Sequence, residues 1–452
     1  MVREPASRFS DHPMWSSSES YYVSRGLAAF SSGEVPHHIS TSRFLALGLA
    51  AVVAAFWADA SGTASFGEGE GEGQSEASAA EEEATATWYV LELGCGTGRL
   101  GLQLATELRR RHHACPGKCC VVLVDLDPSA ALRLCATSAA APLVSEGWLD
   151  VASLQADEPA GTPLQLLRSG RRIAPGSLRT PLVLLGCYFF DSLPVDVFRV
   201  TPGAEDEVEA LQGLQALQAE GREDAFAYVP CEPASYFDKA GRGEEDGPPL
   251  GRLLASCLSE GAATAVREGR GRACATAVPT AAMRCLWRLA GLRHGAGKPV
   301  PLLLLVGDKV VEAEEAGRLL RGEAAAGAPL RLSDLKLFDR HAGAVSHALC
   351  LPPLAEALRL CCTGGQASQE GATAGESGGG VVVLRSAPLM EFDVATLLWP
   401  KGPWDRTRRA FAAELAQFGP SEWQVLQEYA SQLSTRRDMR STLRRFRPWL
   451  GT

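Results

Sequence analysis

The chain has 452 residues, of which 46% are apolar and 21% are charged, and its formal net charge is -9. This length and composition predict a globular protein of one large or two ordinary domains, and they exclude a disordered or fibrous chain. The acidic balance argues against a general nucleic-acid binder, because such proteins carry a basic surface.

Cysteine usage and the N-terminal sequence bear on the compartment. The thirteen cysteines include no CxxC pair, which favours free thiols in a reducing compartment such as the cytoplasm, with the mitochondrion as the alternative. Cys115, Cys119 and Cys120 lack a second ligand pair at zinc spacing, so we expect no metal. The first thirty residues lack the apolar segment of a signal peptide. The run "FLALGLAAVVAAFWA" from Phe44 is shorter than the roughly 20 residues of a membrane span, so we predict a packed helix and no membrane.

Composition divides the chain into four regions. Residues 1–60 are expected to form an N-terminal helical or lid segment, and the Gly-, Ser- and Glu-rich residues 61–87 a flexible acidic linker. Residues 88–400 are expected to form the main domain, with a helical insertion at about 201–297 and a disordered low-complexity loop at 363–380. Residues 401–452 are predicted to form a basic helical tail.

Short apolar runs set the fold class of the main domain. "WYVLEL", "CVVLVDLD", "PLVLLGCYFF" and "VPLLLLVGD" are bounded by Gly or Pro and separated by helical stretches. A parallel sheet that is buried on both faces requires such runs. The sequence therefore predicts an α/β fold with a Rossmann-like doubly wound sheet.

The stretch "VLELGCGTGRLG" admits two nucleotide-binding interpretations. Gly96, Gly98 and Gly101 fit the dinucleotide pattern G-x-G-x-x-G, whereas Glu92 followed by Gly94, Gly96 and Gly98 gives E-x-G-x-G-x-G. A carboxylate before the first glycine would repel a pyrophosphate and would tolerate an ammonium group. Glu92 therefore favours S-adenosylmethionine, a sulfonium amino acid without phosphate.

An acid at the end of the second strand supports this interpretation. Such an acid accepts hydrogen bonds from ribose hydroxyls, about 20 residues beyond the glycines in dinucleotide domains. Asp125 in "VVLVDLD" fits, and Asp127 is the reserve candidate. The alternative is an aspartate that caps a helix.

Together these residues resemble a class I S-adenosylmethionine-dependent methyltransferase. "CYFFDSLPVDVF" is similar to "NEFFDALP" of the MidA-type enzymes, whose mitochondrial members act as protein arginine methyltransferases in respiratory complex I assembly. It resembles still more closely "ANYVFDSIPQDAF" of a tetratricopeptide-associated methyltransferase-like group. "AFSSGEVPHHISTSRFLALGLA", "LLVGDKV" and "FDRHAGAVSHA" also resemble segments of that group, so the resemblance runs from about Phe9 to Trp423.

The resemblance implies roles for individual positions. Gly94, Gly96 and Gly98 would line the amino-acid part of the cofactor and Asp125 would bind its ribose. Gln155 takes the place of the acid beside the adenine, with Asp157 two residues further on. Two positions depart from the group: Cys187 replaces an asparagine and Val310 replaces a glycine, and both bear on activity more than on cofactor binding.

Other residues are candidates for the acceptor side. Asp191 follows the third apolar run and is the candidate to hold an acceptor nitrogen, with a turn-capping role as the alternative. One or two of the aromatic residues Tyr188, Phe189 and Phe190 would contact a cationic ligand. The histidines that the resemblance brings near the site are His37, His38 and His341.

Two functions from different classes remain open at this point. The first is a methyltransferase that acts on a protein side chain, with arginine possible by resemblance. The second is a catalytically impaired methyltransferase-like scaffold or assembly factor that binds cofactor or a protein partner. A nicotinamide dehydrogenase rests on the dinucleotide pattern alone and is disfavoured by Glu92.

Overall fold

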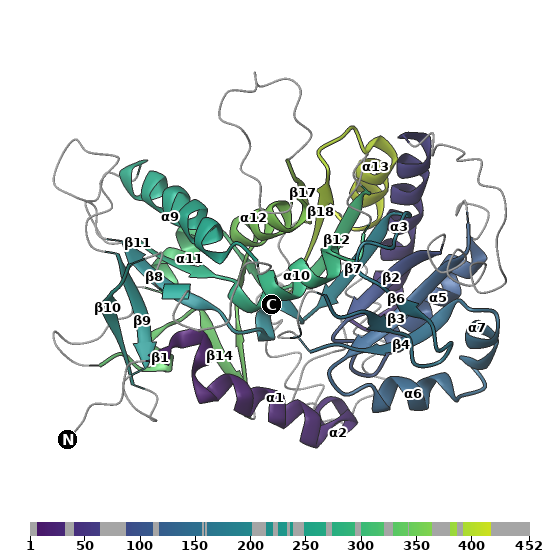
Figure 1. Cartoon of the computed structure of the whole chain (residues 1–452), viewed down its shortest axis with the longest axis horizontal. Helices are drawn as coiled ribbons and strands as arrows, with labels where there is room; N and C mark the ends of the chain where they lie inside the picture. The colour runs from purple at the N-terminus through teal and green to yellow at the C-terminus, as the bar shows by residue number, and fades with distance from the viewer. Residues whose placement is uncertain are drawn as a thin grey trace, which may run out of the picture.

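The structure is a computed structural model of the 452-residue chain, and Figure 1 shows its ribbon. It describes residues 7–31, 40–63, 87–111, 117–155, 158, 161–200, 214–219, 225–232, 236–237, 248–267, 274–293, 300–320, 329–341, 343–363, 380–386 and 392–416. Most of the predicted linker, the interior of the loop at 363–380 and residues 417–452 of the tail lie outside this set, as do Cys115, His37, His38 and Asp157.

A seven-stranded sheet in the order β17-β18-β12-β7-β2-β3-β4 forms the centre of the main domain. Five neighbouring strands run parallel: β4 (Leu149–Ser153), β3 (Cys119–Asp125), β2 (Trp88–Leu93), β7 (Leu182–Cys187) and β12 (Leu302–Asp308). β18 (Asp393–Trp399) pairs antiparallel with β12, and β17 (Val382–Arg385) pairs antiparallel with β18. The strand order reverses between β2 and β7, so the predicted doubly wound α/β sheet is confirmed.

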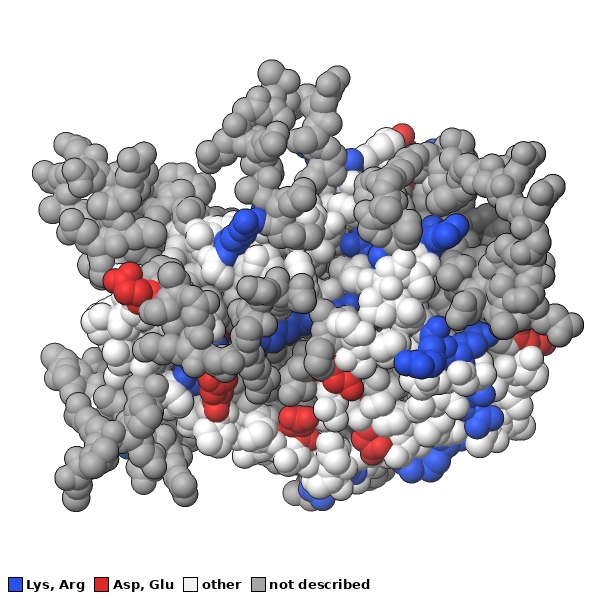
Figure 2. All heavy atoms as spheres, in the orientation of Figure 1, with Lys and Arg blue, Asp and Glu red and all other residues white. Residues whose placement is uncertain are grey.

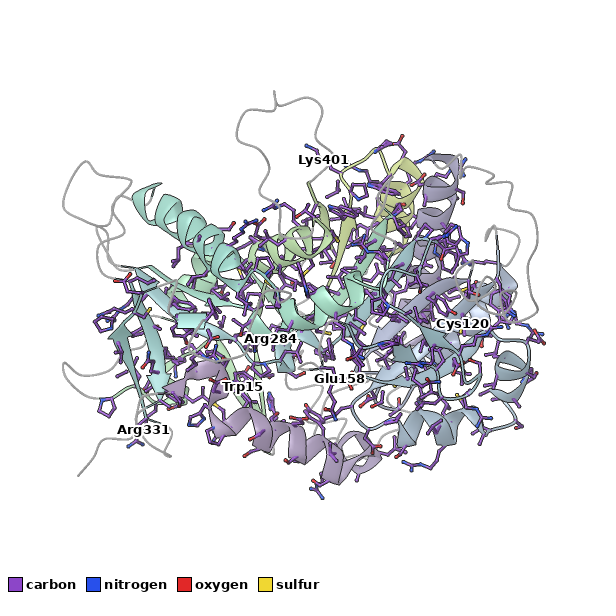
Figure 3. The ribbon with its side chains drawn as sticks, in the orientation of Figure 1. Trp15, Cys120, Glu158, Arg284, Arg331 and Lys401 are labelled. Carbon is purple, nitrogen blue, oxygen red and sulfur yellow. The ribbon has the colours of Figure 1, made fainter. Side chains whose placement is uncertain are left out.

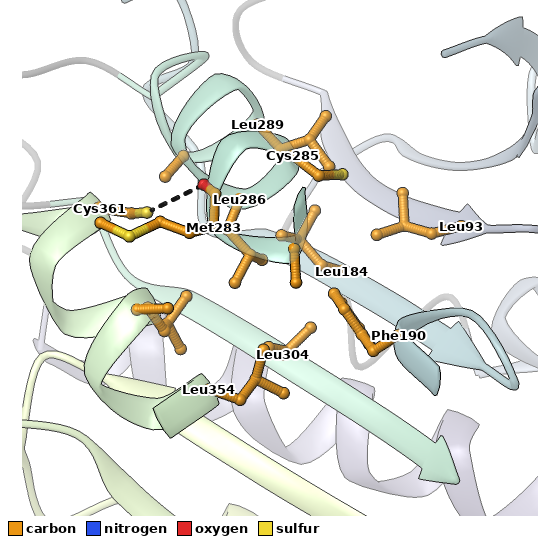
Figure 4. Close-up of a cluster of buried hydrophobic side chains, with 14 of the residues drawn as sticks. Leu93, Leu184, Phe190, Met283, Cys285, Leu286, Leu289, Leu304, Leu354 and Cys361 are labelled. Atoms are coloured by element: carbon orange, nitrogen blue, oxygen red, sulfur yellow. Dashed lines mark hydrogen bonds between the residues drawn. The ribbon is translucent and has the colours of Figure 1, made fainter. Parts of the chain in front are cut away.

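Alternating residues of the sheet feed two separate cores. Leu91, Val122, Leu184 and Leu304 point to a core shared with α9 (Leu250–Arg267), α10 (Thr280–Ala290) and α12 (Leu351–Cys362). Figure 4 shows the α10 part of this core, where the Cys361 thiol lies 3.6 Å from the carbonyl oxygen of Met283. The opposite face packs against α3 (Arg43–Thr63), α5 (Arg99–Arg110) and α13 (Asp405–Glu414). Helices on both faces explain why the strands are apolar throughout.

Helix α3 contains the apolar run that starts at Phe44. Its segment Arg43–Ser61 has a mean hydropathy of 1.8 and is long enough to cross a membrane, but 67% of it is buried inside the protein. α3 packs against α5 and α13, and Asp59 accepts hydrogen bonds from the backbone N–H and hydroxyl of Thr407 at 2.9 and 2.8 Å. The apolar surface of α3 is thus covered by the protein's own helices.

The insertion expected to be helical contains strands as well as helix α9. β8 (Asp196–Val200), β9 (Gln215–Ala219), β10 (Phe226–Pro230) and β11 (Cys274–Val278) form an antiparallel sheet with the N-terminal β1 (Ser7–Arg8). The expectation of a helical insertion is therefore wrong for these segments. β1 and β11 pair with their neighbours over long sequence separations, and tertiary pairing of this kind overrides local composition.

The N-terminal helices join the two sheets. α1 (Pro13–Arg25) and α2 (Leu27–Ser31) run along one side of the molecule, from the five-stranded sheet to the seven-stranded one (Figure 1). α1 packs on a hairpin of β14 (Phe338–His341) and β15 (Ala344–His347), where Ser18 Oγ accepts a hydrogen bond from the Val345 N–H at 3.1 Å. The remaining elements are α6 (Ser129–Cys135), α7 (Ala141–Ser145), β5 (Leu164–Gln165), β6 (Arg172–Ile173), β13 (Val310–Val311), α11 (Ala313–Leu319) and β16 (Leu349–Cys350).

Candidate functional site

A cavity of about 820 Å³ lies at the carboxyl ends of the parallel strands. Its walls come from the turns that follow β2, β3, β4, β7 and β12, and from α1, α10 and the β14–β15 hairpin. Trp15 of α1 and Arg284 of α10 line it, and Figure 3 shows both near the middle of the molecule, between the two sheets. Open α/β sheets bind ligands at this place, where the strand order reverses.

The turn after β2 has a backbone that only glycine adopts easily. Gly94, Gly96 and Gly98 have φ angles of 64°, 50° and 68°, which is the left-handed region. A Cβ on Gly94 would lie 2.8 Å from the Phe189 ring, and one on Gly98 would lie 2.7 Å from Leu134. All three positions therefore require glycine, and the turn leads directly into α5.

Asp125, the last residue of β3, holds this glycine turn. Its Oδ2 accepts a hydrogen bond from the Gly96 N–H at 2.7 Å. Burial raises the pKa of Asp125, and the backbone donors that it accepts from oppose that shift. Asp127 instead accepts a hydrogen bond from the Ser129 N–H at 3.0 Å at the start of α6. Hydrogen bonds from the Ser129 side chain and backbone lower the pKa of Asp127. Both residues line the cavity, and Asp125 is the one joined to the glycine turn.

Glu92, at the end of β2, lines the cavity and packs against the first turn of α5. It is 4% exposed, and a Cβ on Gly101 would lie 2.2 Å from its Oε2. Burial raises the pKa of Glu92 to about 8, although a hydrogen bond from the Gly101 backbone acts in the opposite direction. Glu92 is thus mostly protonated at neutral pH, and the negative charge that sequence reasoning assigned to it is not present there.

Gln155 lines the cavity just after β4. Its side chain is exposed, and its carbonyl oxygen lies 3.5 Å from an Nη of the buried Arg288, which also pairs with Glu158. Arg284, one turn earlier on α10, lines the same part of the cavity. This wall was predicted only through Gln155; the two arginines were missed because the sequence gives no sign that α10 faces β4.

The end of β7 turns sharply toward the cavity. Cys187 and Phe189 line it, as does Tyr188, which has a left-handed φ of 52°. The Tyr188 N–H donates to the Gly307 oxygen at 2.8 Å. Phe190 is 1% exposed and lies in the core among Leu184 and Leu304 (Figure 4). Two of the three aromatic residues thus face the cavity, and the third anchors the turn.

Asp191 follows this anchor and meets a second carboxyl. Its backbone N–H lies 3.3 Å from Oδ2 of Asp308, the last residue of β12, which is fully buried. Burial raises the pKa of both acids, that of Asp191 to about 7. Asp308 was missed, although its place at the end of "LLLLVGD" matches that of Asp125 at the end of "VVLVD".

Other expected residues lie at varying distances from the cavity. His341 lines it from β14, as do Tyr22 and Glu19 from α1. Val310 instead lies in β13, is 8% exposed and pairs with Leu349. Cys187 lies between two acids, and burial together with the nearby Glu92 and Asp308 raises the pKa of its thiol well above the ordinary value. Among the described residues, no group of three or more His, Cys, Asp or Glu side chains is placed to hold a metal ion.

Comparisons with known proteins add weak likenesses. No protein-family model matches the chain, and no curated protein matches its sequence. One solved structure is a COG1565 superfamily member from Burkholderia thailandensis, described as a likely methyl transferase and bound to S-adenosyl-homocysteine. It has 14% sequence identity and a TM-score of 0.38, and the match covers 89% of this chain and 96% of that one. An uncharacterized COG1565 superfamily protein from the same organism has 13% identity and a TM-score of 0.37, with 87% and 95% covered. Likenesses this weak do not assign a function to this chain.

Proposed function

We propose that the protein is an S-adenosylmethionine-dependent methyltransferase whose cavity holds cofactor and methyl acceptor side by side. One observation carries the proposal. Where the strand order reverses, the glycine turn held by Asp125 and a second acid, Asp191, line the same cavity. The first half fits a nucleoside ligand, and the second fits a nitrogen acceptor.

The residues of the first half suit the cofactor. Gly94, Gly96 and Gly98 leave the backbone accessible for the amino-acid part, and Asp125 has one oxygen that is not bonded to Gly96 and suits a ribose hydroxyl. Gln155 lines the same cavity, which supports the contact with the adenine edge that the resemblance implies. S-Adenosylmethionine supplies a methyl group activated on a sulfonium.

The sheet order argues against a nicotinamide dehydrogenase. Dinucleotide domains have six strands in the order 3-2-1-4-5-6. Here the fifth parallel strand, β12, is followed by the antiparallel β18, with β17 outside it. Glu92, mostly protonated, adds little to this distinction at neutral pH.

The protein's share of the chemistry is to position the acceptor and to hold a proton. Placing two reactants in one geometry contributes several kcal/mol to catalysis, on the order of 7–11 in the best cases. Tyr188 and Phe189 offer aromatic faces to a cationic group. Asp191 is placed to accept a hydrogen bond from the acceptor.

The charge of the cavity favours a basic acceptor segment. Seven Asp and Glu side chains line it, one of which, Glu92, is mostly protonated at neutral pH, against three Lys and Arg side chains. Acidic residues also face the viewer along α1 in Figure 2, whereas Lys and Arg gather on the side of α5 and α6. A field of this sign attracts cationic protein segments and repels nucleic acid. A protein side chain is thus the proposed acceptor, arginine being the candidate by resemblance, and the proposed compartment is the cytoplasm.

Methyl-tritiated S-adenosylmethionine added to the protein and a cell extract tests the proposal. We expect label on one or a few extract proteins, and much less with the Asp191→Asn variant. Cofactor binding without transfer of label to any protein would favour the scaffold alternative, which the cysteine at position 187 also suits. Methylated-peptide mass spectrometry of the labelled proteins would then identify the acceptor residue.

A further inference from the structure

Asp191 and Asp308 are brought together by the register of two strands. β7 and β12 run parallel with Gly307 opposite Cys187, so the turn after β7 passes beside the end of β12. The Asp191 N–H lies 3.3 Å from Oδ2 of Asp308, and the Lys309 N–H lies 2.9 Å from Oδ1. The backbone thus fixes the Asp308 carboxyl in one orientation toward Asp191.

The turn that carries Asp191 is equally fixed. Phe190 is buried in the core directly before it, and Ser192 Oγ donates to the Phe189 carbonyl oxygen at 2.7 Å directly after it. Tyr188 holds its left-handed backbone through the bond to Gly307 and through its ring, whose centroid lies 5.2 Å from that of Phe392. The two carboxyls therefore cannot move apart without breaking this packing.

Two buried carboxyls in contact do not both ionise at neutral pH, because like charges repel in a medium of low polarity. Burial is the main cause that raises the pKa of Asp308 well above its ordinary value, and the charge of Asp191 adds to it. The pKa of Asp191 is raised less, to about 7, because Asp308 hydrogen-bonds to it and favours its ionised form. The pair thus holds one proton in the neutral range, on Asp308.

One atom of the pair has no partner. Asp191 Oδ1 is inaccessible to water and makes no hydrogen bond within the described part of the chain, although Asp191 lines the cavity. A buried acceptor without a donor is rare in native proteins. Because water does not reach Oδ1, its donor has to come from the protein, and the proton of Asp308, whose side chain hydrogen-bonds to Asp191, suits it.

We propose that Asp191 and Asp308 work as one acid pair, in which Asp308 keeps a proton that it shares with Asp191 Oδ1 and so orients Asp191, and the part of the Asp191 carboxyl that lines the cavity accepts an N–H of the methyl acceptor. This inference rests on the proposed methyltransferase function and names Asp308 as a positioning residue that acts through Asp191. The acceptor class it implies is a nitrogen nucleophile that loses a proton on methylation.

The step balances without a further reactant. The nitrogen lone pair forms a bond to the methyl carbon while the carbon–sulfur bond breaks, and its electron pair stays on sulfur as a neutral thioether. The acceptor nitrogen becomes positively charged and gives its proton to the Asp191 carboxylate. The proton on Asp308 is not consumed.

Groups packed around the pair shape its titration. Asp393 of β18 lies opposite Asp308. An Nη of Arg385 lies 2.8 Å from Oδ2 of Asp393. The side chain of Lys309 is turned toward Asp339, 3.4 Å away. Titratable groups near the pair include Tyr22, the Cys187 thiol and His347. Burial, together with the Asp191 charge, raises the pKa of Tyr22 to about 12. His347 Nε2 lies 3.2 Å from the Leu193 oxygen. Burial lowers the pKa of His347. Asp191 is thus the group of this set that ionises near pH 7.

The direct test is a carboxyl carbon NMR titration of the full-length protein with ¹³C-labelled aspartate. It compares the unmodified protein with Asp191→Asn, Asp308→Asn and, as a control, Asp339→Asn at an exposed acid on the cavity rim. We expect a signal that titrates near pH 7 and disappears in Asp191→Asn. A second signal should titrate at higher pH in the unmodified protein and move to lower pH in Asp191→Asn, because the neighbouring charge is gone. Two signals that titrate below pH 5, or that do not respond to each other's substitution, would overturn the pair.

Activity variants test the positioning role. Asp308→Asn keeps a neutral hydrogen-bond donor, so its rate should stay within about tenfold of the unmodified protein and rise with pH around the same midpoint. Asp308→Leu removes the donor, so its rate should fall at least about 100-fold and the midpoint should move to higher pH. Equal behaviour of the two variants would contradict a positioning role for Asp308.

Cofactor binding keeps the two proposals separate. Calorimetry with S-adenosylhomocysteine on both Asp308 variants should give the affinity of the unmodified protein, which also shows that they fold. Failure of the unmodified protein to bind this compound would overturn the proposed function, while the NMR titration would still decide the acid pair.

Discussion

The two halves of the cavity are built differently. On the β2–β3 side the main chain is held by hydrogen bonds that are already complete, such as the 2.7 Å bond from the Gly96 N–H to Asp125. On the β7–β12 side, Tyr188 has a strained backbone and Asp191 Oδ1 lacks a donor within the described part of the chain. Strain and unsatisfied polar atoms gather at sites that await a ligand. Glu92 Oε2 on the β2–β3 side also lacks a donor within the described residues, so the two halves differ mainly in backbone strain. Under the proposed function the first half would hold the cofactor and the second the acceptor.

The largest effect is expected from Asp191→Asn, which should lower methyl transfer without changing cofactor affinity. Loss of a general base costs roughly 10²–10⁴ in rate. Label transfer should fall by at least about 100-fold, while calorimetry should give unchanged affinity for S-adenosylhomocysteine. Glu314→Gln, at an exposed acid of α11 that is not among the cavity-lining residues, is the matched control and should keep nearly full activity. A parallel loss of cofactor affinity in Asp191→Asn would show that the halves are not independent.

Asp125→Ala should have the opposite signature. Removing it leaves the Gly96 N–H without its acceptor and takes away the ribose partner, so cofactor affinity should fall by about 1.5–3 kcal/mol. Calorimetric titration measures this loss. Asp127→Ala is the comparison, since it removes a hydrogen bond at the start of α6 and should lower stability with little effect on binding. Equal cofactor affinities in the two variants would remove Asp125 from the site.

Gly101→Ala tests the packing behind the glycine turn. Its Cβ would lie 2.2 Å from Glu92 Oε2 and 2.3 Å from Leu123, so something must shift. Overpacking of this kind costs about 1–3 kcal/mol. Urea denaturation should show this loss of unfolding free energy. Gly251→Ala in α9 meets no atom within 4 Å and should be neutral or slightly stabilising. An unchanged midpoint for Gly101→Ala would contradict the close approach of α5 to β2.

The smallest effect is the pH dependence that Glu92 contributes. Its pKa is about 8 in the folded protein against 4.5 for a free group, so between these values the folded protein keeps a proton that the unfolded chain has lost. Stability therefore falls as pH rises through this window. Glu92→Gln should lessen this fall, by on the order of 1 kcal/mol between pH 7 and 8. Urea denaturation at both values measures the change; a fall as steep as that of the unmodified protein would show that Glu92 does not carry it.

The sequence predicted the parallel sheet and the cofactor half because their signals are local. The strand, the glycine turn and the acid at the end of β3 lie within residues 88–125 and are readable from spacing alone. The antiparallel sheet of β1, β8, β9, β10 and β11 was not predicted, because β1 and β11 join it across long sequence separations. Sequence patterns do not reveal such pairings.

The acceptor half was predicted only in part for the same reason. Asp191 was recognised at the end of its strand, but its partner Asp308 is 117 residues away and meets it only through strand register. The protonated state of Glu92 likewise depends on burial between β2 and α5, which the sequence does not show. Sequence reasoning identified the acids but not which of them carry charge.

Calorimetric titration of the unmodified protein with S-adenosylmethionine, S-adenosylhomocysteine and NAD tests the central claim most directly. We expect both sulfur compounds to bind at micromolar concentration, and NAD not to bind, because the site combines a glycine turn with acids and follows a sheet that departs from the dinucleotide order. Binding of NAD together with failure of both sulfur compounds to bind would contradict the account.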